Sequence, residues 1–61
     1  MYAKYAKLRD AKNVTDYQVA QATGVSTASL SNWKAGRYTP KIDKLLKLAE
    51  YFGVTIEELL A

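Results

Sequence analysis

With 61 residues, of which 49% are hydrophobic and 25% charged, the chain suffices for one small folded domain, so a single domain over residues 1–61 is expected. The absence of cysteine and histidine excludes disulfides, Cys/His zinc sites, thiol nucleophiles and histidine general bases. We therefore expect no enzyme activity, no metal and no cofactor. No apolar run approaches the roughly 18 residues of a membrane span, and no signal-peptide pattern is present, so a cytoplasmic location without membrane contact is expected.

The formal net charge of +3 is unevenly distributed along the chain. Met1–Lys12 carries four basic residues against one acid, Lys34–Lys47 carries five against Asp43, and Leu48–Ala61 carries only acids. One basic surface and one acidic end is the outline expected of a domain that binds a polyanion. Charge that merely keeps the domain hydrated would explain the composition about as well.

The first two predicted helices lie in the N-terminal part of the chain. Residues 2–12 are rich in alanine and lysine, which favours a helix over Tyr2–Lys12. A second helix is predicted to begin after Thr15 and to end near residue 22, because Thr15 and Gln18 have the spacing of a capping box. Gly24 predicts a tight turn after this helix, since glycine tolerates a positive φ.

Three further helices are predicted in the second half. Ser26 caps the third, which runs to about Ala35 and stops at Gly36. Thr39 with Pro40 predicts the start of the fourth, because proline is tolerated at the first helical position, and residue 53, a glycine, ends it. A second capping box, at residues 55 and 58, predicts a short fifth helix.

The apolar residues recur at helical spacing and no two-residue alternation competes, so the predicted fold class is all-α with five helices. The predicted core is Tyr5, Leu8, Val14, Val19, Ala20, Val25, Leu30, Trp33, Ile42, Leu45, Leu48, Ala49, Phe52, Val54, Ile56 and Leu59.

The segment from Thr15 to Gly36 predicts two helices that cross at a steep angle. Such a crossing needs a small residue at the contact point and a flexible corner, which Ala20 and Gly24 supply, while Val25 fills the turn. Leu30 and the nearby tryptophan would bury one face of the third helix. This arrangement predicts a helix-turn-helix.

The opposite face of the third helix is predicted to be small and uncharged. It carries Thr27, Ala28, Ser31, Asn32 and Ala35. A surface helix without a special role more often carries Glu and Lys at such positions. Small side chains would instead let the helix approach base edges in the major groove of double-stranded DNA.

Asn32 is the one side chain on this face that can make a bidentate contact, which suits adenine best. Thr27 and Ala28 would touch thymine methyl groups, and Ser26 and Ser31 would serve as donors or acceptors. We expect half-sites with important A·T positions, although a residue at the helix end, Lys34 or Arg37, could read guanine. The alternative for Asn32 is an ordinary exposed polar residue.

A group of cations and a tyrosine beyond this helix is predicted to contact phosphates. It comprises Lys34, Arg37, Tyr38, Lys41 and Lys44. The free backbone N–H groups at the start of the fourth helix would add a site for an anion. A charged, solvated loop is the alternative.

The ordered pattern T-x-x-x-V-A-x-x-x-G-V-S-x-x-x-L-S-x-W, followed by L-L-K-L-A-E-Y-F-G-V-x-x-x-E-L-L, resembles the lambda-repressor/Cro-type helix-turn-helix family of bacterial and phage transcriptional regulators. The resemblance covers about Leu8 to Leu60. It implies a compact lambda-repressor-like domain of five helices, with helix 3 in the major groove, and dimers on two-fold-symmetric operators. It also implies base-reading roles for Ser26, Thr27, Ala28, Ser31 and Asn32.

Two positions depart from the family pattern. Members commonly carry a DNA-contacting Gln directly after the threonine of helix 2, where this chain has Asp16, so Tyr17 or Gln18 is expected to supply that phosphate contact. Many members carry Glu after the tryptophan of helix 3, paired with an arginine of helix 1. Here Lys34 follows the tryptophan, so Arg9 needs another partner or faces DNA itself.

The sequence thus predicts a dimeric DNA-binding regulator, most simply a repressor, of bacterial, phage or prophage type. The candidate dimer interface is Leu46, Ile56, Leu59 and Leu60. The alternative is an antitoxin-like protein-interaction module, in which exposed Leu46, Tyr51 and Leu60 would bind a partner protein. A further C-terminal domain beyond this chain, or a protein partner, is compatible with both hypotheses.

Overall fold

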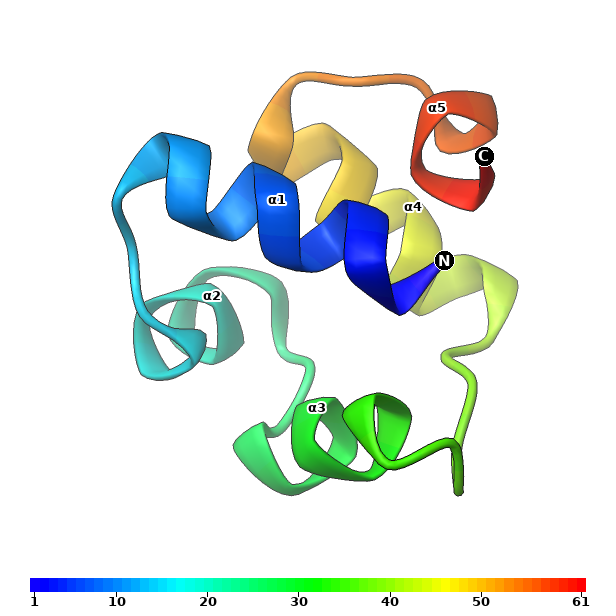
Figure 1. Ribbon diagram of the computed structural model, residues 1–61. Helices are drawn as coiled ribbons and strands as arrows, with labels where there is room; N and C mark the ends of the chain where they lie inside the picture. Colours follow the sequence, from blue (N-terminus) through cyan, green and yellow to red (C-terminus); the bar gives the residue numbers. More distant parts are fainter.

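The computed structural model describes all 61 residues as five helices without a strand (Figure 1), which confirms the predicted all-α fold. The helices are α1 (Tyr2–Lys12), α2 (Asp16–Thr23), α3 (Thr27–Lys34), α4 (Ile42–Phe52) and α5 (Ile56–Leu60). The molecule measures 24 × 21 × 19 Å. None of the helices has the length and apolar character needed to cross a membrane.

Side-chain caps set three of the five helix starts as the sequence predicts. Thr15 accepts a hydrogen bond from the backbone N–H of Gln18 at 3.2 Å, and the Gln18 side chain accepts one from the backbone of Thr15 at 2.9 Å. Thr55 and Glu58 repeat this reciprocal capping box before α5. Ser26 caps α3 by accepting from the backbone of Ser29 at 3.0 Å.

The start of α4 differs from the prediction. The helix begins at Ile42 and not at Thr39 or Pro40, because Lys41 has an extended backbone with φ −72° and ψ 165°. Pro40 is buried against the rest of the domain instead of occupying the first helical position. The residue before a proline also disfavours the helical conformation, which agrees with the absence of helix at Thr39.

The core forms where all five helices meet. Its buried members are Tyr5, Val19, Val25, Leu30, Trp33, Leu45, Leu48, Ala49 and Leu59. The predicted core residues Leu8, Val14, Phe52, Val54 and Ile56 are partly buried and pack against it, and Ala20 is also half-buried.

The core prediction for Ile42 is wrong, because its side chain is 60% exposed. At about 100° of rotation per residue, Ile42 lies at the edge of the stripe formed by Leu45, Leu48, Ala49 and Phe52. As the first residue of α4, it also has no preceding helical turn beside it. A helical spacing of three residues was therefore insufficient to bury it.

An aromatic cluster extends the core between α1 and α3. Trp33 meets the rings of Tyr2 and Tyr5 at centroid distances of 5.4 and 5.3 Å, and Phe52 meets Tyr5 at 5.9 Å. Such pairs add attraction beyond the apolar area that they bury. In Figure 1, α3 lies at one edge of the bundle, with its long side open to solvent. The cluster holds it there by one face.

Candidate nucleic-acid interface

The turn between α2 and α3 is fixed by a buried threonine that the sequence analysis did not identify. The Thr23 hydroxyl donates to the carbonyl of Val19 at 2.7 Å and accepts from the backbone N–H of Val25 at 3.3 Å. Gly24 between them has φ 80° and ends α2. Val25 is 2% exposed and fills the corner as predicted. The crossing of the two helices is thus held by both hydrogen bonds and packing.

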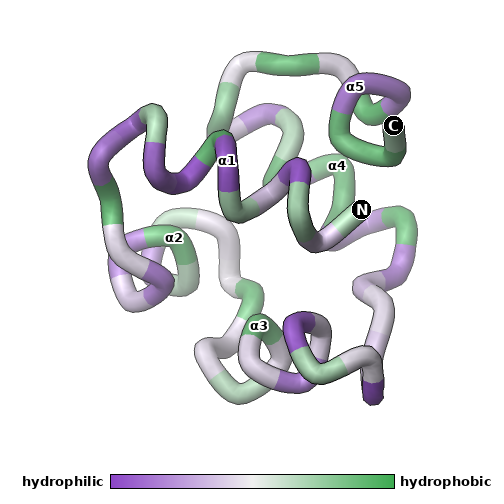
Figure 2. The backbone as a smooth tube through the Cα atoms, in the orientation of Figure 1, coloured by the Kyte–Doolittle hydropathy of each residue, from purple (hydrophilic) through white to green (hydrophobic).

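The two faces of α3 differ sharply in chemistry. Leu30 and Trp33 are 1% and 5% exposed and attach the helix to the core. The outer face carries exposed Thr27, Ala28 and Ser31 and, less exposed, Asn32. In the hydropathy view, most of α3 has the pale colour of moderately polar residues (Figure 2). The outer face therefore has no charged side chain that would hold it away from a partner.

Ser26 at the start of this face is engaged within the protein. Its hydroxyl accepts from the backbone of Ser29 and lies 2.9 Å from the Ser29 hydroxyl. The Ser26 hydroxyl, which the sequence analysis assigned to base reading, is therefore engaged in capping α3.

Asn32 forms a pair with Arg37 that the sequence analysis did not anticipate. The Arg37 Nε donates to Asn32 Oδ1 at 3.1 Å, and the Arg37 backbone N–H donates to the Asn32 carbonyl at 2.9 Å. Gly36, with φ 78°, reverses the chain between them. The five-residue separation of Asn32 and Arg37 is not a helical spacing, so only the turn after α3 explains their contact.

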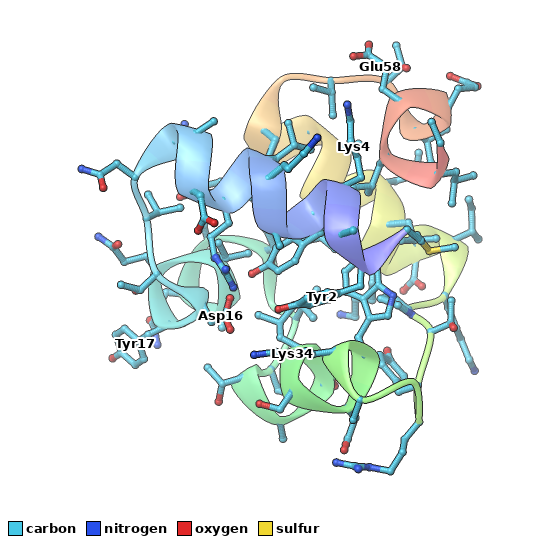
Figure 3. All side chains as sticks on the ribbon, viewed as in Figure 1. Tyr2, Lys4, Asp16, Tyr17, Lys34 and Glu58 are labelled. Carbon is cyan, nitrogen blue, oxygen red and sulfur yellow. The ribbon has the colours of Figure 1, made fainter.

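The cations assigned to phosphate contact lie in different surroundings. Arg37 and Lys41 are exposed in the segment between α3 and α4. Lys34 projects from α3 toward the side on which Asp16 lies (Figure 3), and its charge contributes to lowering the pKa of Asp16. Lys44 is half-buried, with its Nζ 3.9 Å from the place where a side chain on Gly24 would begin.

Three uncharged candidates also differ in availability. Tyr17 is 65% exposed and projects outward from the start of α2 (Figure 3). The Gln18 side chain is bound to Thr15 in the capping box. Tyr38 packs against the core and is half-buried.

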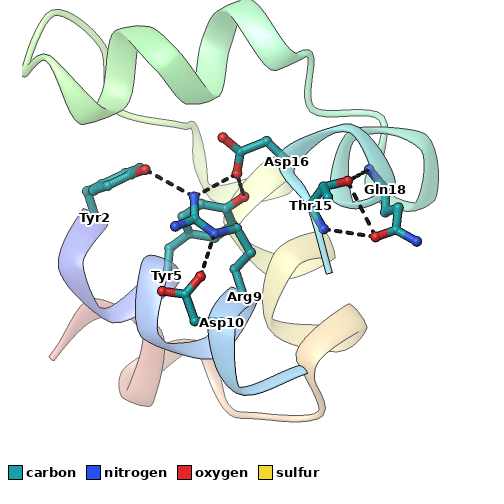
Figure 4. A network of polar contacts seen from close by, with 7 residues as sticks. All are labelled: Tyr2, Tyr5, Arg9, Asp10, Thr15, Asp16 and Gln18. Atoms are coloured by element: carbon teal, nitrogen blue, oxygen red, sulfur yellow. Dashed lines mark hydrogen bonds and ion pairs between the residues drawn. The ribbon is translucent and has the colours of Figure 1, made fainter. Parts of the chain in front are cut away.

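Asp16 supplies the partner that Arg9 lacks on α3. Its Oδ1 accepts from the Tyr5 hydroxyl at 2.6 Å and from Arg9 Nη1 at 2.9 Å (Figure 4). Arg9 also pairs with Asp10 through Nε at 3.1 Å, and its Nη1 lies 3.4 Å from the Tyr2 hydroxyl. Arg9 is thus engaged in an α1–α2 network, which both departures from the family pattern help to form.

The ionisation of this network follows from its contacts. Burial alone would raise the pKa of Asp16, but hydrogen bonds from Tyr5 and Arg9 and the charges of Arg9 and Lys34 lower it below its ordinary value of 3.8. Burial, followed by the hydrogen bond to Asp16, raises the pKa of Tyr5. The network is therefore stable as a carboxylate, a guanidinium and a neutral phenol at neutral pH.

The apolar side chains predicted to contact a partner differ in their exposure. Leu59 is 0% exposed, so the prediction that it lies at a dimer interface is wrong for this side chain, which closes the core. Leu46 and Leu60 are 50% and 43% exposed. Ile56 is half-buried, and so is Tyr51, which packs on the core with Lys12 Nζ 5.0 Å from its ring centre. Tyr51 is thus less available to a partner than predicted.

Comparisons with known proteins agree with the geometry of α2 and α3. A helix-turn-helix family model matches residues 6–59. The HTH-type transcriptional activator BcrR of Enterococcus faecalis is 38% identical over 58 residues, which are 95% of this chain and 28% of that protein. No solved structure gives a significant match.

Two further relatives are more distant. An uncharacterized HTH-type transcriptional regulator of Methanocaldococcus jannaschii, MJ0272, is 32% identical over 97% of this chain and 89% of its own length. The cryptic phage CTXphi transcriptional repressor RstR of Vibrio cholerae is 32% identical over 92% of this chain and 50% of its own length. The family match agrees with the hydrogen-bonded turn after α2 and with the buried and exposed faces of α3. This chain belongs to the helix-turn-helix family of DNA-binding transcription regulators, in its lambda-repressor/Cro-type branch.

Proposed function

We propose that the domain recognises a specific sequence in double-stranded DNA as a homodimer, with α3 in the major groove, and represses transcription by occupying an operator. The observation that carries this proposal is the outer face of α3. Its side chains are short and uncharged, while Leu30 and Trp33 anchor the opposite face. Such a helix can approach base edges closely without losing its attachment to the core.

Phosphate contacts would come from groups that flank α3. Arg37 and Lys41 are exposed, and α4 begins without a side-chain cap, so its first backbone N–H groups are available to a phosphate oxygen. Tyr17 would contact the backbone from the other end of the helix pair. These groups would fix the position of the domain on the duplex without reading its sequence.

Dimer formation is supported by apolar side chains outside the core. Ile42 and Leu46 lie one turn apart on α4 and are 60% and 50% exposed, and Leu60 is 43% exposed on α5, which packs against α4. One helix in one groove discriminates few base pairs, whereas two would read half-sites about 34 Å apart. An antitoxin-like role would use the same apolar surface for a different protein.

Repression is the direction of regulation that needs the simplest mechanism, because a protein bound at an operator blocks polymerase. The matched relatives include both a protein named as an activator and one named as a repressor. The chain spans only 28% and 50% of these two relatives. The names of the relatives therefore favour neither direction of regulation.

Selection of bound duplexes from a randomised DNA library at about 150 mM salt tests the proposal. We expect a two-fold-symmetric motif with half-sites about one helical turn apart. Failure to enrich any motif with folded protein would contradict sequence-specific binding. Recovery of one asymmetric half-site would contradict the dimer alone.

A pair of matched lysine variants tests the phosphate contacts. Lys41→Ala is expected to weaken binding to all duplexes and to reduce the salt dependence of the binding constant by about 0.9 in logarithmic slope, because one phosphate contact is lost. Lys4→Ala, which removes an equal charge from a side chain that points away from α3 (Figure 3), should change the slope much less. Equal slopes for the two variants would remove Lys41 from the interface.

A further inference from the structure

The contact between Arg37 and Asn32 ties the segment after α3 back onto the outer face of that helix. Two hydrogen bonds form it, one from the Arg37 backbone to the Asn32 carbonyl at 2.9 Å and one from Arg37 Nε to Asn32 Oδ1 at 3.1 Å. Arg37 is exposed and Asn32 is half-buried, so the pair lies at the surface. The guanidinium is thus held beside the face proposed to enter the major groove.

The chemistry of the two side chains fixes which atoms remain available. Nε of an arginine can only donate, so the amide atom of Asn32 that faces it must be the oxygen. The groups still available are the four N–H bonds on the two Nη atoms of Arg37, the NH₂ group of Asn32 and the second lone pair of Asn32 Oδ1, whose first accepts from Arg37. Six N–H donors thus remain beside one acceptor position. The pair therefore presents mainly donors, two of them on the neighbouring Nη atoms of Arg37.

Only one base offers two neighbouring acceptors in the major groove. Guanine presents N7 and O6, both acceptors, whereas adenine combines the N7 acceptor with the N6 donor. Cytosine presents a donor, and thymine presents one acceptor beside a methyl group. A surface of donors matches guanine and opposes the donors of adenine and cytosine.

We propose that Asn32 and Arg37 act as one unit that selects a guanine in each half-site. Arg37 makes the bidentate contact to N7 and O6 through its Nη atoms, and Asn32 positions the guanidinium through Nε. This inference rests on the proposed function, because it requires α3 to lie in the major groove. It replaces the expectation, drawn from Asn32 alone, of a bidentate contact to adenine, and it moves Arg37 from the phosphate contacts to the base contacts.

The pairing also predicts what happens when Arg37 is removed. The Oδ1 atom of Asn32 is then no longer occupied by the guanidinium, and the amide oxygen and nitrogen together match adenine N6 and N7. In the Arg37→Ala variant, the guanine preference should therefore be lost and a preference for adenine should appear in its place. A role of Arg37 limited to phosphate contact would weaken binding on all sequences equally.

The experiment is library selection with the wild-type chain and with Arg37→Ala, Asn32→Ala and Lys41→Ala. We expect one guanine position per half-site in the wild type, its replacement by adenine with Arg37→Ala, and weaker guanine discrimination with Asn32→Ala. Lys41→Ala is the matched cationic control and should keep the wild-type motif. Circular dichroism would verify that each variant is folded.

Modified duplexes give a second test, in which the DNA is changed. Replacing the selected guanine by 7-deazaguanine removes N7 and is expected to weaken wild-type binding roughly five- to ten-fold. The same replacement should have little effect on Arg37→Ala. Inosine at this position changes only the minor groove and should leave the affinity of the wild type nearly unchanged.

The outcomes separate this inference from the proposed function. A symmetric motif that stays the same in Arg37→Ala, or a wild-type affinity insensitive to 7-deazaguanine, would overturn the guanine-reading unit and leave sequence-specific binding intact. Absence of any motif with the wild-type chain would overturn both.

Discussion

At the scale of single residues, Asp16 shows how neighbouring side chains accommodate a residue that departs from the family pattern. An acid at the start of α2 is unfavourable next to DNA phosphates, yet it stabilises this domain by accepting hydrogen bonds from Tyr5 and Arg9. Lys34 adds a favourable charge from α3. The acid therefore has an internal role that its position in the sequence does not indicate.

The Asp16→Asn variant is expected to lower the free energy of unfolding by about 1–2 kcal/mol at neutral pH, because two hydrogen bonds lose their charged acceptor. The expected loss is small for two charged hydrogen bonds because the Asp16 side chain is 36% exposed, so solvent partly screens its ion pair. Urea denaturation measures it. Asp10→Asn is the matched control: the Asp10 side chain is 71% exposed, so a change of at most a few tenths of a kcal/mol is expected there.

The stabilisation by Asp16 should also depend on pH. Its pKa in the folded chain lies below the ordinary value of 3.8, so its contribution is fully present above about pH 4 and is lost as the pH falls through the lower, folded-state pKa. The difference in unfolding free energy between wild type and Asp16→Asn should stay constant from about pH 5 to pH 7 and shrink below pH 4. A difference that persists unchanged at about pH 2 would exclude the ionised carboxylate as its cause.

At the scale of helices, the sequence was informative where a side chain caps a helix and uninformative where packing decides. The caps at Thr15, Ser26 and Thr55 act within four residues, so their spacing alone located three helix starts. At the start of α4, Pro40 is buried outside the helix and Lys41 is extended. No local pattern distinguishes a buried proline before a helix from one in its first turn.

Gly24 between α2 and α3 allows a test of the turn itself. An added methyl group would meet nothing closer than Lys44 Nζ at 3.9 Å, so its cost would come from the positive φ of 80° and not from a clash. Gly24→Ala is expected to lower the free energy of unfolding by about 1–2 kcal/mol. Thermal denaturation followed by circular dichroism measures this loss.

The matched control for this position is Gly24→Asn, because asparagine tolerates a left-handed backbone better than alanine does. Asn13 already adopts φ 59° at the end of α1 in this chain. Asparagine should therefore be less destabilising than alanine, despite its larger side chain. The reverse order would show that space and not backbone conformation limits this turn.

At the scale of the whole molecule, the sequence located the α3 surface but not all of its internal contacts. The exposed and buried faces of α3 follow from helical periodicity, so exposed Thr27, Ala28 and Ser31 could be identified without a structure. The partner of Arg9 and the contact of Arg37 with Asn32 required the positions of other elements. Contacts made across a turn or between helices have no periodic signature in the sequence.

The proposed dimer can be tested at an exposed leucine that the core does not need. Leu46→Glu places a charge among apolar side chains of α4 and is expected to shift the domain to monomer in analytical ultracentrifugation while its helical content is retained. Gln21→Glu adds the same charge to exposed α2 and should leave the dimer intact. A wild-type chain that stays monomeric even on DNA would rule out the dimer.

The engagement of Arg9 with Asp16 has a consequence for how α3 can vary among copies of this domain. Since the hydrogen-bonded partner of Arg9 lies on α2, the rest of the domain depends on α3 through Leu30 and Trp33, the cap at Ser26 and the charge of Lys34. New residues at Thr27, Ala28 and Ser31 would disturb neither the core nor the ion pair. The domain is thus suited to exchange of its outer helix face, by evolution or by grafting, without a compensating change elsewhere.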